Sequence, residues 1–100
     1  MKARRVVFSP EAEEDLAQIY DWIADAGNPV TALNYVTRIA DECRTLDFAS
    51  ERGRARDDVR SGLRTMGFER SATIAFVVEL DQVTILRIFK GGRNWETEFD

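Results

Sequence analysis

The fold is decided by residues 9–46, which read SPEAEEDLAQIYDWIADAGNPVTALNYVTRIADECRTL. Ser9-Pro10 and Asn28-Pro29 each place a capping side chain before a proline, and proline is favoured in the first turn of a helix. Apolar residues then recur at steps of three and four, which is the spacing of one helical stripe. Gly27 suits the position just past the end of the first helix. The short link between the two helices predicts an antiparallel helical hairpin.

The two apolar stripes define the face that the hairpin turns towards a core. They are Ala12, Leu16, Ile19 and Ile23 in the first helix and Ala32, Val36, Ile39, Cys43 and Leu46 in the second. Trp22 borders the first stripe, so packing is favoured over recognition for its indole ring. Cys43 has no histidine to activate it, which predicts a buried and inert thiol. The acids of the first turn complement the helix dipole, and this explanation is favoured over a metal site.

Short runs rich in β-branched and aromatic residues predict strands on both sides of the hairpin. The predicted strands are Arg4–Phe8, Leu63–Phe68, Thr73–Leu80 and Val83–Phe89. A polar surface loop is expected over residues 50–58, a bulge at Gly67, and a tight link at Asp81-Gln82. This order predicts an α+β fold, β-α-α-β-β-β, in which the helical hairpin packs on one face of a mostly antiparallel sheet. A chain of 100 residues is expected to form one domain over 1–100.

The second face of this sheet is expected to be partly apolar. Alternation directs Ile74, Phe76 and Val78 to one face and Ala75 and Val77 to the other. In the last strand, alternation groups Val83, Ile85, Arg87 and Phe89 on one face, and Thr84, Leu86 and Ile88 on the other. The hairpin covers only one side, and an apolar patch with arginines at its rim is typical of a partner site. The alternative is that the C-terminal tail or the N-terminal residues fold over this patch.

Composition narrows the chemistry further. The chain has no histidine, one cysteine and a net charge of −4, which argues against histidine-based catalysis, a thiolate metal site and a wholly basic nucleic-acid binder. Residues 1–50 carry −4 and residues 51–93 carry +3, so the surface is expected to be polarised. Arginine is a poor base, which favours docking over catalysis. We predict no catalytic residue, metal ligand or cofactor. No long apolar run or signal peptide is found, so we expect a cytoplasmic protein without membrane contact.

Four segments, in order along the chain, resemble the RelE/ParE toxin superfamily, and its ParE branch most closely. The first is Val7-Phe8-Ser9-Pro10-Glu11-Ala12-x-x-Asp15-Leu16-x-x-Ile19, and the second is Asn28-Pro29-x-x-Ala32. The third is Gly53-Arg54, and the fourth is VTILRIFKGGRN over residues 83–94. Together they span nearly the whole chain, so the resemblance concerns the entire predicted fold.

The resemblance implies a toxin of a type II toxin–antitoxin pair. Its partner would be a ParD-like antitoxin, which carries the DNA-binding domain and wraps the toxin with a C-terminal segment that is disordered alone. ParE-type toxins poison DNA gyrase by trapping its cleaved-DNA complex, without covalent chemistry of their own. RelE-type relatives instead cleave mRNA on the ribosome, with basic residues and commonly a C-terminal tyrosine. This chain has no tyrosine after Tyr35 and only two lysines, Lys2 and Lys90, which favours the ParE branch.

The resemblance and the sheet pattern together give candidate contact residues. We expect the antitoxin to cover the outer face of the hairpin and the open part of the sheet, with contacts at Arg64, Val77 and Arg87. We expect the gyrase-facing region at the C-terminal end, formed by Arg87, Lys90, Arg93, Trp95 and Phe99. Truncation after Gly92 is expected to keep the fold and abolish toxicity. Two alternatives stay open, a RelE-like ribosome-dependent mRNA endonuclease and a non-toxic interaction module.

Overall fold

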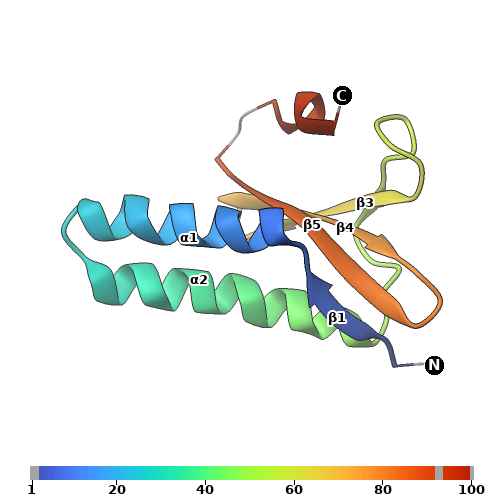
Figure 1. Ribbon diagram of the computed structural model, residues 1–100, viewed down its shortest axis with the longest axis horizontal. Coiled ribbons are helices and arrows are strands. Elements are labelled where there is room, and N and C mark those ends of the chain that lie inside the picture. Colours follow the sequence, from blue (N-terminus) through green and yellow to red (C-terminus); the bar gives the residue numbers. More distant parts are fainter. Residues whose placement is uncertain (1–2, 92–93, 100) are drawn as a thin grey trace.

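The computed structural model describes residues 3–91 and 94–99, and it places two helices against one face of a five-stranded mixed sheet (Figure 1). The elements in chain order are β1 (Arg5–Phe8), α1 (Pro10–Asp25), α2 (Pro29–Arg44), the 3-10 helix η1 (Thr45–Asp47), β2 (Arg54–Ala55), β3 (Leu63–Phe68), β4 (Ala72–Val78), β5 (Gln82–Lys90) and the 3-10 helix η2 (Trp95–Phe99). The predicted α+β architecture is therefore confirmed.

Both helices begin where their capping residues predict, and α1 ends just before the predicted Gly27. The Ser9 hydroxyl accepts a hydrogen bond from the Ala12 amide at 3.0 Å, and the Asn28 side chain accepts one from the Thr31 amide at 3.1 Å. These bonds satisfy amides that have no partner within the first turn. Gly27 follows α1 with a φ of 105°, a left-handed conformation that glycine adopts without steric cost. The chain thus reverses between the helices at the predicted position.

The strands lie in the order β1-β5-β4-β3-β2, and β1 pairs with β5 in parallel while the other pairs are antiparallel. The prediction of a continuous loop over residues 50–58 is wrong, because β2 pairs there with β3. The link between β4 and β5 covers residues 79–81 instead of Asp81-Gln82, since Gln82 already pairs with Arg5. Both differences arise from pairing with a distant strand, which local composition does not encode.

A β-bulge lies in β5 and not at the predicted Gly67. The β3–β4 register runs without a shift from Leu63 to Phe68, whereas Ala75 pairs with Arg87 and Phe76 pairs with Ile85, so Leu86 is the extra residue. The predicted alternation along β5 is therefore wrong after Ile85. Because one residue is inserted, Ile88 faces the helices together with Ile85.

The main core lies between the helical hairpin and the sheet. Its buried members include Ala12, Ile19, Ile39, Cys43, Leu46, Ile74, Phe76, Val83, Ile85 and Ile88. Leu16, Ile23 and Val36 are half-buried against this cluster, so both helical stripes face it as predicted. Burial raises the pKa of the Cys43 thiol to about 12, which keeps it protonated at neutral pH. The prediction of a buried thiol is confirmed.

Trp22 departs from the expected packing. The residue is 64% exposed, so the prediction that its indole ring serves packing is wrong. The buried face of α1 includes Ala12 and Ile19. Trp22 lies beside this face and not on it, so its side chain is left largely in contact with solvent. No helix in residues 3–91 or 94–99 is long and apolar enough to cross a membrane.

Alanine substitutions at two glycines test how closely the chain just before β2 approaches β3. A Cβ at Gly53 would lie 2.2 Å from the Thr65 carbonyl oxygen, and its φ of 74° already disfavours other residues. Gly53→Ala is expected to lower the free energy of unfolding by at least about 2 kcal/mol. Gly67→Ala is the matched control, because its Cβ would meet no atom within 4 Å. Urea unfolding with equal midpoints for the two variants would contradict this packing.

Candidate functional site

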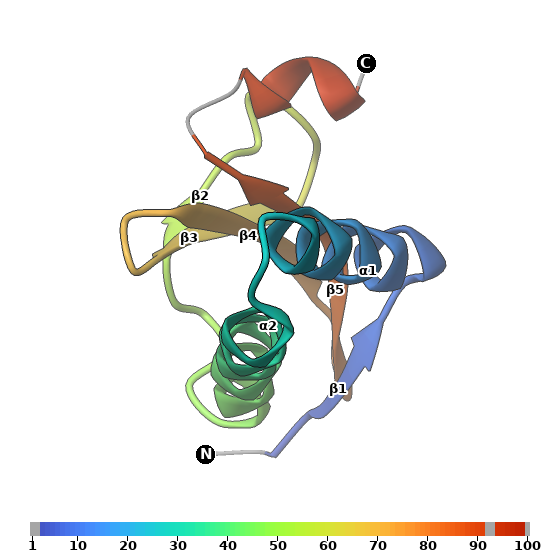
Figure 2. The same cartoon turned by 90° about the vertical axis from the view of Figure 1, so that its left-hand side faces the viewer.

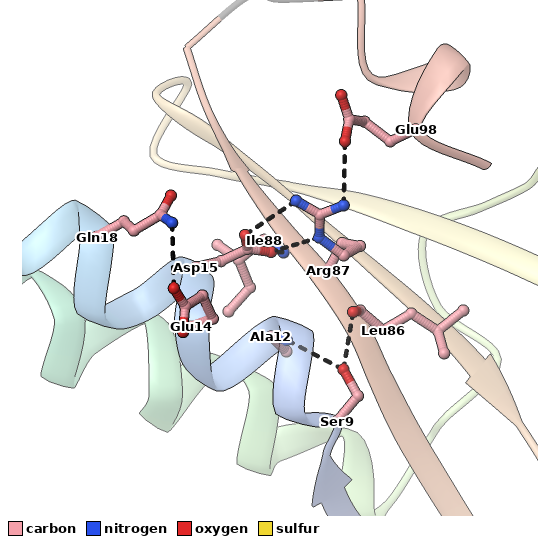
Figure 3. Close-up of polar contacts among 9 residues, drawn as sticks. All are labelled: Ser9, Ala12, Glu14, Asp15, Gln18, Leu86, Arg87, Ile88 and Glu98. Atoms are coloured by element: carbon pink, nitrogen blue, oxygen red, sulfur yellow. Dashed lines mark hydrogen bonds and ion pairs between the residues drawn. The ribbon is translucent and has the colours of Figure 1, made fainter. Parts of the chain in front are cut away.

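The open edge of β5 is closed by the start of α1. Strand β1 ends at Phe8, opposite Ile85, and the next outward-facing groups of β5 find partners on the helix. The Ser9 hydroxyl donates to the Leu86 carbonyl at 2.9 Å, and the Ile88 amide donates to the Asp15 carboxylate at 2.8 Å (Figure 3). The side chains of the N-cap Ser9 and of Asp15 in α1 therefore continue the hydrogen bonding of the sheet where a strand is missing.

Arg87 is fixed on the same carboxylate. Its Nε lies 2.8 Å from Asp15 Oδ2 and its Nη2 lies 3.0 Å from Asp15 Oδ1, a bidentate pair drawn in Figure 3. The Asp15 side chain is only 9% exposed. The hydrogen bond to Asp15 raises the pKa of Arg87, so the guanidinium stays charged. The remaining nitrogen, Nη1, lies 3.2 Å from Glu98 Oε1 in η2.

Arg56 is held in the same manner at the other side of η2. Its Nε and Nη2 each lie 2.9 Å from the two carboxylate oxygens of Asp58, and its Nη1 lies 3.6 Å from Glu96 Oε2. The hydrogen bond from Arg56 lowers the pKa of Asp58, which therefore stays ionised at neutral pH. In each arginine, Nε and Nη2 are therefore bound to a carboxylate outside η2, and Nη1 faces a glutamate of η2.

The second face of the sheet is covered by η2. In both Figure 1 and Figure 2, η2 and α2 lie on opposite sides of the sheet. The ring of Trp95 stacks on Phe89 with centroids 5.9 Å apart, and Phe99 meets Phe89 edge-on at 6.0 Å. Beneath these rings, Leu63, Ala75 and Phe89 are at most 1% exposed. The expectation of an open apolar face is wrong here, and the alternative of a folded-over tail is what the structure shows.

We call this covered face the η2 face: the apolar residues Leu63, Ala75 and Phe89, together with Arg56, Arg60 and Arg87 at its rim. The Arg56 guanidinium lies 5.0 Å from the Trp95 ring centroid, and that of Arg60 lies 6.0 Å from the Phe99 centroid. The arrangement suits carboxylates and aromatic rings, since fixed guanidinium groups attract both.

The structure brings only some of the predicted contact residues together. Arg87, Trp95 and Phe99 meet at the η2 face, and Val77 is on the same side of the sheet because it pairs with Leu63. Arg64 pairs with Phe76, whose side chain faces the helices, and its Nε donates to the Arg52 carbonyl at 2.9 Å. Arg93 is outside the described residues.

Lys90 belongs to a different surface, beside the helical hairpin. Its Nζ lies 5.5 Å from the ring centroids of both Trp22 and Tyr35. The exposed Trp22 and the neighbouring Lys90 line a shallow pocket with Gln18 and Ile88. The expected target-facing set is thus divided between two surfaces, one around η2 and one around Lys90.

Sequence reasoning missed Arg56, Arg60 and Asp58 as members of a site. All three lie in the segment between β2 and β3, where no periodicity marks which side chains turn towards the sheet. The only local signal was the pairing of Arg56 with an acid two residues on. Within residues 3–91 and 94–99, no group of three histidine, cysteine or acidic side chains is placed to hold a metal ion.

Comparison with known proteins gives a consistent family match. The profile of the family described as "ParE toxin of type II toxin-antitoxin system, parDE" matches residues 6–95. A solved structure titled "Chromosomal ParDE TA system from P. aeruginosa" is 27% identical, with a TM-score of 0.79, and the match covers 90% of this chain and 98% of that one. A conserved hypothetical protein from Helicobacter pylori shares the fold at 15% identity, with a TM-score of 0.52 over 87% and 93% of the two chains. No curated protein sequence matches the chain.

Removing the Asp15 carboxylate tests how much the closed edge contributes. Asp15→Ala removes the acceptor of the Ile88 amide and of two Arg87 nitrogens, and we expect a loss of about 3 kcal/mol in the free energy of unfolding. Asp15→Asn keeps an acceptor for the amide and is expected to cost less. Glu14→Ala, an exposed acid one residue earlier, is the control and should stay within about 0.5 kcal/mol of the parent. Equal losses at positions 14 and 15 in urea unfolding would argue against this role.

Proposed function

The chain belongs to the ParE toxin family of type II toxin–antitoxin systems, and from this premise we propose that it poisons DNA gyrase and is neutralised by a ParD-like antitoxin. The proposed action is binding, without covalent chemistry. The observation that carries it is the η2 face, where fixed arginines surround aromatic rings. Such a surface suits acidic and aromatic groups of another macromolecule, and its own carboxylates are ion-paired with the arginines.

The nucleophiles and acid–base groups of the chain support binding over catalysis. The chain has no histidine, and the single thiol, that of Cys43, is buried with its pKa raised to about 12. The hydroxyl of Tyr35 is hydrogen-bonded to the Ser71 hydroxyl, and Tyr35 as a whole is only 8% exposed. These groups are engaged in the fold, whereas the arginines at the rim already bind carboxylates of the chain itself, which is the binding chemistry that the proposal needs.

The antitoxin is proposed because a relative of known structure is described as part of a ParDE system. We place its contacts at Arg64, Val77 and Arg87. Arg64 lines a groove with Arg4 and Leu80, and Leu80 is 78% exposed, so this end of the sheet suits a segment with acidic and apolar residues. Arg87 is proposed to contact both antitoxin and gyrase, which would make the two complexes mutually exclusive and so explain neutralisation.

The gyrase-facing surface is proposed to include Arg87, Lys90, Arg93, Trp95 and Phe99. The segment after Gly92 supplies Trp95 and Phe99 to the packing on Phe89. Truncation there would therefore uncover an apolar face as well as remove target contacts. Point variants at exposed positions separate these two effects.

Expression of the chain alone in bacteria tests the proposal. We expect growth arrest, induction of the DNA-damage response and intact mRNA, and we expect co-expression of a ParD-like antitoxin to restore growth. Cleaved mRNA without DNA damage would instead place the chain with the RelE-type nucleases. Normal growth with a folded, expressed protein would contradict toxicity altogether.

Lys90 offers a sharper test of the target surface. Lys90→Ala removes a cation beside the exposed Trp22 and is expected to weaken gyrase poisoning about tenfold, as the loss of one charged interface contact does. Arg70→Ala, an exposed arginine in the turn between β3 and β4, is the control and should retain full activity. Supercoiling and cleavage-complex assays with both purified proteins measure the difference. Equal activity of the two variants would remove Lys90 from the proposed surface.

A further inference from the structure

Two arginines at the rim of the η2 face each have a bidentate carboxylate partner that lies outside η2. Arg87 is fixed through Nε and Nη2 on Asp15, and Arg56 is fixed through the same two nitrogens on Asp58. In both cases Nη1 is the nitrogen that meets an acid of η2. Because each guanidinium has this partner outside η2, we expect the two positive groups to stay near these positions when η2 is displaced.

The segment that occupies this face carries a matching pattern. In the sequence Trp95-Glu96-Thr97-Glu98-Phe99, an acid lies on each side of Thr97 and an aromatic residue stands at each end. Glu96 and Glu98 meet Arg56 and Arg87, while Trp95 and Phe99 meet Phe89. The contacts between this segment and the rest of the described chain include ion pairs of Glu96 and Glu98 and ring contacts of Trp95 and Phe99. A single 3-10 turn attached in this way is among the least stable elements of a domain.

We propose that the η2 face is a docking site for an acidic, aromatic segment of a protein partner, and that residues 94–99 are a removable internal ligand of this site. The charge pattern selects the class of partner, since the segment already bound is an acidic peptide. The partner segment supplies two carboxylates to Nη1 of Arg56 and Arg87 and an aromatic or large apolar side chain to Phe89. The inference concerns this face alone and does not require that gyrase is the target.

The internal ligand sets a threshold for binding. A tethered segment competes at an effective concentration in the millimolar range. A partner segment must therefore bind the face more tightly than η2 does in order to displace it at a lower concentration. Weakening η2 without touching the face should therefore strengthen binding of the same ligand supplied from outside. This dependence separates a removable ligand from a tail that is merely part of the fold.

The test uses the full chain and a probe peptide. The probe is a fluorescein-labelled, amidated peptide with the sequence of Asn94–Phe99, and binding is measured by fluorescence anisotropy. We expect the E96Q/E98Q chain to bind it about tenfold more tightly than the parent chain, because the internal competitor has lost both ion pairs. A probe with both glutamates replaced by glutamine should bind about tenfold more weakly than the original probe.

Two further arginine variants locate the site. Added to E96Q/E98Q, Arg56→Gln should lower probe affinity about tenfold. Arg38→Gln should leave it unchanged, because Arg38 forms an equivalent bidentate pair with Glu69 on the side of α2. Amide chemical shifts of Leu63, Ala75 and Phe89 in the E96Q/E98Q chain should move as the probe is added, which locates the peptide even if Arg56→Gln reduces stability.

Several results would overturn the proposal. Equal probe affinity for the parent and E96Q/E98Q chains would show that η2 does not compete for the face. Equal effects of Arg56→Gln and Arg38→Gln would show binding by charge alone. Displacement of the probe by a short single-stranded DNA at similar concentration would assign the face to nucleic acid. Each readout is independent of toxicity, so a failed gyrase assay leaves this test unaffected.

Discussion

The carboxylate of Asp15 is the interaction on which the rest of the structure depends. The parallel strand β1 stops at Phe8, and without a substitute the edge of β5 beyond it would expose unpaired backbone groups. Asp15 accepts from the Ile88 amide and from two nitrogens of Arg87, so one side chain fixes α1 against the sheet and sets the direction of a guanidinium. The charge is buried, but three donors compensate for its desolvation.

That same arginine connects the fold to the proposed function. The bulge at Leu86 pairs Arg87 with Ala75 and turns Phe89 to the face away from the helices. One arginine is therefore shared by the core, through Asp15, and by the η2 face, through Glu98. A variant at Arg87 would disturb both, and loss of toxicity in such a variant would not identify a contact. Lys90 is a better reporter because it lies beside the helical hairpin, on a different surface from the Asp15–Arg87 pair.

Much of the fold could be predicted from sequence where the signals are local. Ser9, Asn28 and the spacing of apolar residues define the hairpin, and alternation along β4 assigns Phe76 and Ala75 to opposite faces. Prediction failed where one inserted residue changes the register. The sequence VTILRIFK does not indicate that Leu86 is an extra residue, and its insertion reverses the faces of Ile88 and Phe89. The site was only partly predictable for a related reason. The structure brings together Arg87, Trp95 and Phe99 of the predicted set, whereas Arg56 and Arg60 lie in an irregular segment whose side-chain directions depend on tertiary packing.

A double-mutant cycle between Asp15 and Arg87 tests the central claim most directly. Free energies of unfolding are measured for the parent, Asp15→Ala, Arg87→Ala and the double variant. If the buried pair joins helix and sheet as described, the two losses should be strongly non-additive, with a coupling of about 2 kcal/mol. Losses that add to within about 0.5 kcal/mol would mean that the two side chains stabilise the protein independently, and the account of the closed edge would be wrong.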